Sequence, residues 1–269
     1  MSMPTITSFQ NPKIKQVMNL RTRKGRKDKG RFVVDGLREI KRANDSGLTI
    51  SEIYTCSAHC SEADTRTLTE IAQKANLPLH PVTQEVYAKI SYGDRQSNGI
   101  AVVETRYRNL NDFRPEKNCR VGVMERVEKP GNLGAVLRSA DATQFSAIFL
   151  ADPIIDLYNP NVIRSSTGAI FSVPVYLCKA EEAKAWLLRE KFDIFAAHLK
   201  GAQEYTVPNY SDKTAIVLGN EAAGLTSVWE KEPVHPIRLP MLGTVDSLNV
   251  SVTAGVLFYE VLRQQRQNR

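Results

Sequence analysis

Apolar and polar positions change pattern repeatedly over the first hundred residues, and each pattern predicts one kind of element. The sequence predicts a short helix over 12–20, a strand turning into an amphipathic helix over 32–47 that closes at Gly47, a strand over 48–56, a helix over 62–76, an extended piece over 77–83 and a strand over 99–106. Strands that alternate with helices indicate a small α/β unit.

A second α/β pattern begins near residue 119. It predicts strands over 121–127, 147–152, 173–177, 192–199 and 214–220, an extended piece over 235–241, and helices over 134–144, 181–191 and 249–267. The last helix carries Val250, Ala254, Leu257 and Val261 on one face. Apolar strands with helices between them predict a parallel sheet covered on both sides.

Length and composition are those of a globular protein with room for two domains. The chain has 269 residues, of which 42% are hydrophobic and 24% charged. The polar, proline-containing segment 107–118 separates the two patterns, so we predict domains over 1–106 and 119–269 joined by a linker. We expect neither a secretory signal nor a membrane span, because no apolar region of the required length occurs.

The net charge of +7 is concentrated at one end of the chain. Residues 1–50 hold twelve Lys or Arg and four Asp or Glu, whereas the remainder is nearly neutral. The basic side chains centre on 21–31: Arg21, Arg23, Lys24, Arg26, Lys27, Lys29 and Arg31. Such a segment favours contact with a phosphate backbone, and the alternative is a solvated or disordered loop that aids solubility.

Two glycine-containing stretches imitate nucleotide-binding motifs. Residues 219–226 have the glycine spacing of a P-loop, but Leu225 occupies the position of the required lysine. The stretch 130–142 follows a strand and opens a helix, and Asp152 could imitate a ribose-binding acid. The G-x-G-x-x-G spacing is missing, so an oxidoreductase with a dinucleotide fold is disfavoured.

The cysteines and histidines point to no metal site. Cys56, His59 and Cys60 cluster, but no convincing fourth ligand is visible, and buried thiols beside a surface histidine are the simpler interpretation. Cys119 and Cys178 complete a set of four, too few for a disulfide scaffold. We therefore expect a reducing compartment, the cytoplasm. The remaining histidines are scattered and suggest no catalytic triad.

Three segments, 130–142, 217–226 and 238–260, each follow a predicted strand. In open α/β sheets the ligand crevice lies at the carboxyl ends of the strands, so these loops can converge on one pocket. They offer a glycine for close backbone approach, an acidic acceptor, apolar walls, and polar groups at a helix start: Gly219, Glu221, Leu239, Met241, Leu248, Ser247 and Asn249. This combination suits an adenosine-like ligand.

Together these segments resemble motifs 1, 2 and 3 of the SpoU (TrmH-type) RNA ribose 2′-O-methyltransferases, within the SPOUT superfamily. The resemblance rests on Asn132-Leu-Gly134 with Arg138, on Gly219-Asn-Glu221 with Gly224-Leu, and on Ser247-Leu-Asn249-Val-Ser251. A fourth match is the stretch 159–175, with its R-x-S-x-G-A pattern. Order and spacing agree across about 119–266. Lys129 departs from the family, because many members carry an acid there.

The N-terminal part resembles the substrate-binding domain of the two-domain branch, whose fold is similar to ribosomal protein L30e. This second resemblance rests on NPKIK, the basic segment and GRFVVDGLREI. It implies that RNA is recognised here, by Arg21, Arg23, Lys24, Arg26, Lys27, Arg31 and, from the fourth match, Arg164. The chain ends soon after the last helix, which favours recognition through the N-terminal domain.

For the C-terminal domain the resemblance implies an α/β fold with a parallel sheet and a deep trefoil knot, bound S-adenosylmethionine, and a homodimer whose site borrows from both subunits. It implies a cofactor site of Gly219, Asn220, Leu239, Met241, Ser247 and Leu248 and a catalytic set of Asn132, Arg138, Glu221, Ser247 and Asn249. Arg138 would hold a phosphate and stabilise the 2′-oxygen, oriented by Asn132, which could instead orient the ribose. Glu221 would anchor the arginine network or the substrate.

The function that follows is S-adenosylmethionine-dependent methylation of a ribose 2′-hydroxyl in structured RNA, with large-subunit ribosomal RNA as the first expectation. Transfer RNA is the nearest alternative substrate. A non-catalytic RNA-binding assembly factor with the same fold is the alternative of another class. It would be expected to lack Asn132, Arg138, Glu221 or Asn249, and all four are present.

Overall fold

The computed structural model describes residues 4–93, 97–198 and 202–267, and these divide into two compact units. The N-terminal unit comprises residues 1–106 and 156–171, and the C-terminal unit comprises 107–155 and 172–269. The predicted boundaries differ in two respects. Segment 156–171 packs with the N-terminal unit, and the predicted linker 107–118 belongs to the C-terminal unit, where Leu110 is buried and Arg108 forms a β-bridge with Tyr176.

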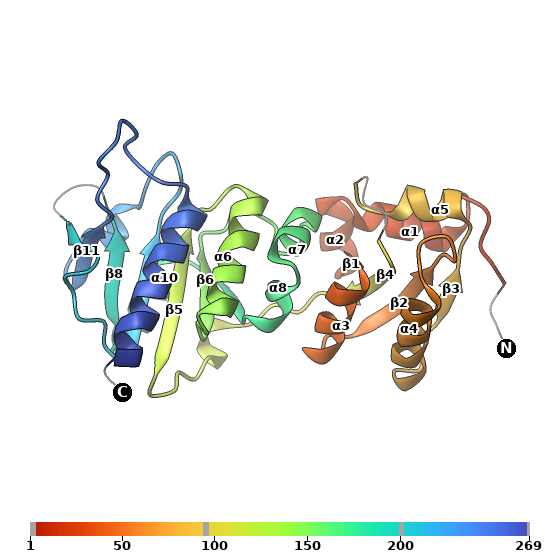
Figure 1. Cartoon of the computed structure of the whole chain (residues 1–269), viewed down its shortest axis with the longest axis horizontal. Coiled ribbons are helices and arrows are strands. Elements are labelled where there is room, and N and C mark those ends of the chain that lie inside the picture. Colours follow the sequence, from red (N-terminus) through yellow and green to blue (C-terminus); the bar gives the residue numbers. More distant parts are fainter. Residues whose placement is uncertain (1–3, 94–96, 199–201, 268–269) are drawn as a thin grey trace. The chain divides into compact units, whose positions relative to one another are not determined.

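The N-terminal unit is a four-stranded sheet covered by helices on both faces (Figure 1). Its strands are β1 (Arg31–Asp35), β2 (Ile50–Thr55), β3 (Leu79–Pro81) and β4 (Ile100–Glu104), in the order β1-β4-β2-β3. Its helices are α1 (Pro12–Leu20), α2 (Arg23–Lys29), α3 (Leu37–Asp45), α4 (Glu62–Lys74), α5 (Gln84–Ile90) and α7 (Pro160–Ser166), with α8 (Ala169–Ser172) at the boundary. Helices α1 and α5 pack in one apolar cluster against the sheet.

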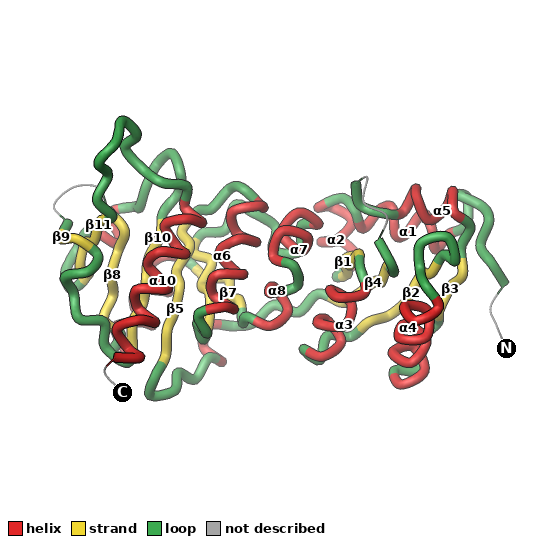
Figure 2. Tube along the Cα trace, in the orientation of Figure 1, coloured by secondary structure: helices red, strands yellow, loops and turns green. Residues whose placement is uncertain are grey.

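The C-terminal unit is built on a parallel sheet, as the sequence predicted (Figure 2). Its strands are β5 (Cys119–Glu125), β6 (Ala147–Ala151), β7 (Val175–Cys178), β8 (Asp193–Ala197), β9 (Gln203–Glu204), β10 (Lys213–Leu218) and β11 (Val234–Arg238), in the order β7-β6-β5-β10-β8-β11-β9. Its helices are η1 (Leu110–Asp112), α6 (Pro130–Ala142), α9 (Ala180–Arg189), η2 (Ser227–Trp229) and α10 (Val250–Gln267). The trefoil knot implied by the resemblance stays a prediction.

Both faces of this sheet are buried, because the side chains of its central strands point alternately to one face and the other and helices pack on each. Trp186 of α9 packs in one cluster with Val121, Val123 and Phe149. On the other face lie α6 and α10 (Figure 1), whose Phe258 approaches Gly122 of β5 so closely that a Cβ on that glycine would lie 2.9 Å from the phenyl ring. The glycine in the middle of the strand therefore lets α10 reach the sheet. The predicted apolar face of α10 is buried.

The cysteines and charged clusters give no sign of a metal centre. All four cysteines are free and buried, and burial raises the pKa of the Cys178 thiol to about 12, so it stays protonated at neutral pH. Across the described residues, no group of three or more His, Cys, Asp or Glu side chains could hold a metal ion. No helix within the described ranges has the length and apolar character needed to cross a membrane.

Buried His80 makes the stability of the N-terminal unit depend on pH. Burial, with the nearby positive charge of Lys13, lowers the pKa of its imidazole below the usual 6.5. The unfolded chain therefore binds the proton more readily, and stability should fall as the pH drops below about 6.5. Urea titrations between pH 5 and 8 should show this slope weakened in His80→Asn. The matched change at exposed His235 should leave it intact, and an equal effect of both changes would contradict the assignment.

Candidate active site

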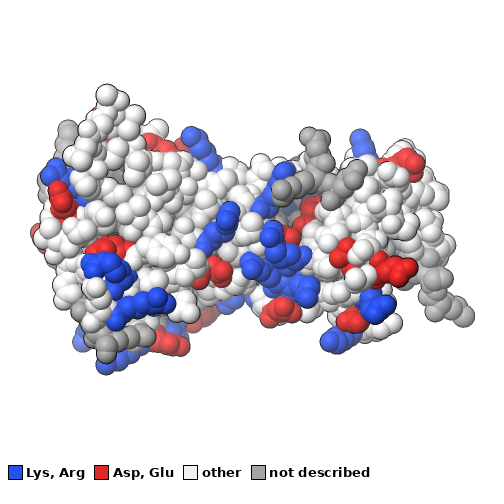
Figure 3. All heavy atoms as spheres, viewed as in Figure 1, with Lys and Arg blue, Asp and Glu red and all other residues white. Residues whose placement is uncertain are grey.

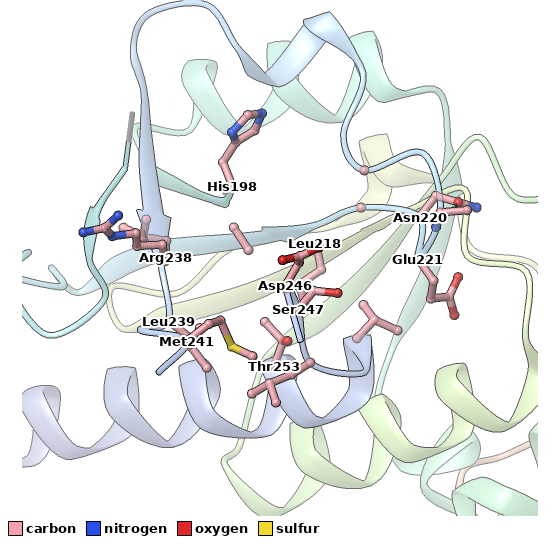
Figure 4. A pocket seen from close by; sticks show the side chains of 17 residues that line it. His198, Leu218, Asn220, Glu221, Arg238, Leu239, Met241, Asp246, Ser247 and Thr253 are labelled. Carbon is pink, nitrogen blue, oxygen red and sulfur yellow. Dashed lines mark hydrogen bonds between the residues drawn. The ribbon is translucent and has the colours of Figure 1, made fainter. Parts of the chain in front are cut away.

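A cavity of about 210 Å³ lies at the carboxyl ends of β8, β10 and β11, where α10 begins (Figure 4). Its lining residues come from four segments: Ala197, His198, Leu218, Gly219, Asn220, Glu221, Ala222, Gly224, Ile237, Arg238, Leu239, Met241, Asp246, Ser247, Leu248, Val250 and Thr253. All six residues expected to hold the cofactor are among them. The loops after β10 and β11 meet at this cavity, as expected from the rule that ligands bind at the carboxyl ends of the strands of an open α/β sheet (the strand-end rule).

The loop after β10 is fixed by its own asparagine. Asn220 accepts hydrogen bonds from the N–H groups of Ala222 (2.8 Å) and Ala223 (2.9 Å) and donates to the Arg126 carbonyl (2.9 Å) and to Glu128 Oε1 (3.0 Å). These bonds use both donors and two acceptor sites of the side chain. Asn220 therefore shapes the cavity, and its backbone N–H and C=O close the same loop by pairing with Gly224. The sequence did not distinguish this structural role from cofactor binding.

Beneath this loop lies Glu125, the last residue of β5. Its carboxylate is fully buried and accepts hydrogen bonds from the Thr226 N–H (2.8 Å), the Thr226 hydroxyl (2.7 Å) and the Trp229 indole N–H (3.0 Å). Three donors stabilise one carboxylate, which therefore pins the end of the 219–226 loop to the sheet. The signal in the sequence that points to Glu125 is an acid at the end of a buried strand.

Replacing Glu125 with glutamine should destabilise the C-terminal unit. The amide would turn an N–H₂ group toward at least one of the three buried donors, so hydrogen bonds are lost and a donor is left unsatisfied. We expect the free energy of unfolding, measured by urea titration, to fall by about 2–3 kcal/mol. Glu181→Gln, at an exposed site on α9, is the matched control and should change little. Similar stability of both variants would contradict this role.

Asn132 connects the three motif segments. It lies in the first turn of α6 and donates its Nδ2 hydrogen bond to Glu221 Oε1. The Asn249 side chain donates to Asn132 Oδ1 over 3.2 Å, and Asn249 in turn accepts from the Ser251 N–H (2.9 Å) and hydroxyl (2.7 Å) at the start of α10. One polar chain, Glu221–Asn132–Asn249, therefore runs beside the cavity. Ser247 and Glu221 also line the cavity itself.

Arg138 lies apart from this polar chain. It follows Asn132 by six residues on α6, which places it about 240° further around the helix axis. Its side chain is exposed, does not line the cavity, and has no hydrogen-bond or ion-pair partner within the described part of the chain. The expectation that Asn132 orients Arg138 is not met within a single chain, because the Asn132 side chain bonds Glu221 and Asn249 instead.

The basic segment is ordered, and two of its arginines are structural. Residues Arg23–Lys29 form α2, with the Thr22 hydroxyl capping its first turn. Arg26 is buried, pairs with Asp156 (2.7 Å) and donates to the Leu20 carbonyl (3.0 Å), so the prediction that it binds RNA is wrong. Arg21 makes a double hydrogen bond to Asp35 (2.5 and 2.7 Å).

The remaining cations of the predicted RNA-binding set lie at the surface. Arg23, Lys24 and Lys27 are exposed on α2, and Arg164 is exposed on α7. Arg31 lies 3.8 Å from Glu104. The surface available to a polyanion on this unit is therefore the exposed side of α2 with α7, rather than the whole segment 21–31.

The cavity of the C-terminal unit suits a cofactor that combines an adenosine with a positive charge. Apolar side chains of Leu218, Ile237 and Leu239 form walls for a planar group, and the Glu221 and Asp246 carboxylates supply negative charge. At Gly219 an added Cβ would lie 2.5 Å from the backbone of Gly224, so this position admits glycine only. Asp246 and His198 line the cavity although the sequence did not single them out as ligands. His198 follows the end of β8, so the strand-end rule could have found it.

Comparison with known proteins gives matches over both units. Residues 120–259 match the family model described as the SpoU rRNA Methylase family, and residues 11–101 match the MRM3-like substrate binding domain. An uncharacterized tRNA/rRNA methyltransferase of Synechocystis is 31% identical over 97% of the chain and 94% of its own length. The 23S rRNA (guanosine(2553)-2′-O)-methyltransferase of Bacillus subtilis is 25% identical over 96% of the chain and 99% of its own length.

Solved structures match over nearly the full length as well. A crystal structure of an RNA 2′-O ribose methyltransferase is 36% identical, with a TM-score of 0.85, and the match covers 98% of this chain and 100% of that one. The crystal structure of an AdoMet-bound rRNA methyltransferase from Sinorhizobium meliloti is 26% identical, with a TM-score of 0.88, and covers 97% of each chain.

Proposed function

The chain belongs to the SpoU rRNA Methylase family, and we propose that it methylates a ribose 2′-hydroxyl of large-subunit ribosomal RNA, with S-adenosylmethionine as the methyl donor. The observation that carries this proposal is the polar chain Glu221–Asn132–Asn249 beside a cavity whose walls suit the donor. Three motif segments far apart in the sequence converge there. We place the reaction in the cytoplasm, in keeping with four free cysteines.

Some residues of the site would position the ribose, and others would stabilise the negative charge that develops on its oxygen. When bound, S-adenosylmethionine supplies a methyl group activated by a sulfonium, so the protein has mainly to position the ribose and stabilise its oxygen. Glu221 and Asn132 offer an acceptor and an amide to a hydroxyl at the cavity mouth. Arg138 supplies a cation for a neighbouring phosphate and for the 2′-oxygen as it becomes anionic. A guanidinium stays protonated in proteins, so we assign it an electrostatic role rather than that of a base.

In a homodimer, Arg138 of one copy could reach the active-site cavity of the other. Arg138 is exposed and does not line the cavity of its own chain, so a second copy is the natural source of the cation. Exposed apolar side chains lie before α10 and along its first ten residues: Leu248 (40% exposed), Val252 (48%) and Tyr259 (54%). Val252 and Tyr259 are seven residues apart on α10 and share one face. An apolar helix face of this kind fits an interface between two identical chains.

The exposed cations of α2 are proposed to bind the RNA backbone. Changing Arg23, Lys24 and Lys27 together to alanine should weaken RNA binding and reduce the slope of log K against log salt by about 2–3. S-adenosylmethionine affinity, measured by calorimetry, should stay unchanged, because these residues belong to the N-terminal unit. The matched control changes exposed Lys74, Lys89 and Lys117 to alanine. An unchanged salt slope in the α2 variant would contradict the role.

The experiment that tests the function is transfer of labelled methyl from S-adenosylmethionine to total RNA, to purified 23S rRNA, to transfer RNA and to large ribosomal subunits. Digestion and mapping of the product would locate the label on a ribose or a base. Label on the 2′-oxygen of 23S rRNA, free or in the particle, supports the proposal. Label on transfer RNA would mean that transfer RNA, rather than ribosomal RNA, is the substrate. Binding of RNA with no transfer to any of these substrates would favour a non-catalytic RNA-binding factor.

A further inference from the structure

The N-terminal unit contains a second cavity, separate from the site described above. Its volume is about 210 Å³, roughly that of seven water molecules in the liquid. It is lined by the turn from β1 into α3, by residues on both sides of 94–96, and by α7: Val33, Asp35, Gly36, Arg38, Glu39, Tyr92, Ser97, Asn98, Pro160, Ile163, Arg164 and Thr167. All of these residues belong to one compact unit.

The interior of this cavity offers an apolar floor and an aromatic side chain. Val33, Pro160 and Ile163 are buried and form the floor, and Tyr92 is half-buried at the wall. The guanidinium of Arg21 lies 5.8 Å from the centre of the Tyr92 ring, and the Tyr92 N–H donates to Asp35 Oδ1 (3.2 Å). The backbone of Tyr92 is therefore anchored beside Asp35, and its ring borders the cavity as a surface on which a planar group can stack.

The polar groups of the cavity are oriented in advance. Within the described part of the chain, the Asp35 carboxylate accepts two hydrogen bonds from Arg21 and one from Tyr92, which leaves one of its roughly four acceptor sites for a ligand donor. Asn98 Oδ1 accepts from the Leu37 N–H (3.0 Å), which fixes the side chain at the wall. An apolar floor with a few convergent, oriented polar groups is the usual composition of a small-ligand site.

The charge around the cavity favours one anionic group. Asp35 is ion-paired with Arg21, and Glu39 with Arg38 (2.5 Å), so these four charges cancel. Among the described residues that line the cavity, the Arg164 guanidinium is the cation left over at the rim, where its Nη1 lies 3.2 Å from the position of a Cβ on Gly93. Figure 3 shows Lys and Arg side chains gathered over α3 and α7. The cavity thus joins an aromatic wall to a cationic rim.

We propose that this cavity binds one unstacked nucleotide of the RNA substrate, other than the nucleotide that is methylated. The base would stack on Tyr92 above the floor, with a donor group of its edge bonded to Asp35, and its phosphate would lie at Arg164. Sequence-specific RNA recognition works mainly through unstacked bases held by aromatic side chains and read by hydrogen bonds. This inference rests on the proposed function, because it takes RNA as the substrate.

The position of the cavity agrees with this role. The ion pair between Arg26 and Asp156 fixes α2 to the chain that leads into α7. The exposed cations of α2 and the rim of the cavity therefore belong to the same compact unit, with α2 joined through Asp156 to the segment that carries α7. A backbone held on α2 could pass a single base into the cavity, which would add sequence preference to an otherwise sequence-independent attraction.

The test compares Tyr92→Ala, Tyr92→Phe and Arg164→Ala with wild type in steady-state methyl transfer to the RNA species that wild type modifies. Tyr92→Ala and Arg164→Ala should each raise KM for RNA about tenfold or more with kcat nearly unchanged, since stacking of one base is worth about that factor. Tyr92→Phe keeps the ring and should restore KM. Arg66→Ala, at an exposed site on α4, is the control for loss of a positive charge.

A second readout identifies the contact directly. RNA carrying 4-thiouridine should crosslink under ultraviolet light to peptides containing Tyr92 or Arg164, and mapping of the RNA side should give a nucleotide different from the methylated one. Unchanged KM in both alanine variants, with equal thermal unfolding, would overturn the cavity's role while leaving the function intact. Crosslinking of the methylated nucleotide itself would also overturn it. Failure of wild type to methylate any RNA would instead contradict the proposed function.

Discussion

Arg138→Ala is expected to reduce kcat for methyl transfer by about 100-fold to 1000-fold while S-adenosylmethionine still binds with unchanged affinity. The reduction is the usual effect of removing one preorganised group that stabilises developing negative charge. The cofactor result follows from geometry, because Arg138 is exposed on α6 and does not line the cavity. Single-turnover methyl transfer and calorimetric titration of the cofactor measure the two quantities separately.

Two further measurements separate this role from a general effect of charge. Arg189→Ala removes an exposed arginine from α9 and should leave kcat unchanged. Glu221→Gln is expected to be impaired as well, and mixing it with Arg138→Ala should restore part of the activity if the arginine acts in the site of the partner subunit. Normal turnover by Arg138→Ala would exclude the electrostatic mechanism. Absence of restored activity in mixed dimers would place the arginine in the site of its own chain.

The sequence predicted the C-terminal sheet well because its strands are buried on both faces. Strand β6 is a continuous apolar run, and β5 and β10 have apolar centres over 121–124 and 215–218, which leave little choice of structure. The same property predicted the site, since parallel strands bring their carboxyl ends to one edge and fix where the loops converge. Helix α5 was missed although Val86, Tyr87 and Ile90 follow a helical spacing, because its seven residues give a weak signal.

The features that escaped prediction depend on contacts between distant parts of the chain. Nothing local in the basic segment distinguishes Arg26 from its neighbours, yet it is buried because Asp156, 130 residues away, lies beside it. Segment 156–171 likewise joins the N-terminal unit through contacts such as the stacking of Tyr158 on Phe32, with ring centres 4.1 Å apart. Neither contact has a sequence pattern of its own.

Gly219→Ala is expected to weaken S-adenosylmethionine binding by about tenfold to 100-fold and to lower stability. An added Cβ would lie 2.5–2.7 Å from backbone atoms of Gly224 and Leu225, too close for any real contact, and backbone cannot rotate away as a side chain can. The loop closed by the hydrogen bonds between Asn220 and Gly224 would have to open, at a cost of about 1–3 kcal/mol. Because this loop lines the cavity, the distortion reaches the ligand directly.

The control lies in the neighbouring loop. Gly243→Ala adds the same methyl group where nothing stands within 4 Å, so cofactor affinity and unfolding temperature should match wild type. If both variants bind the cofactor normally, the loop after β10 is not part of the cofactor site. If Gly219→Ala unfolds more easily but binds normally, the close approach of Gly219 to Gly224 serves stability alone. If only Gly219→Ala binds the cofactor more weakly, the close backbone contact between Gly219 and Gly224 shapes the cofactor cavity, and one added methyl group is enough to disturb it.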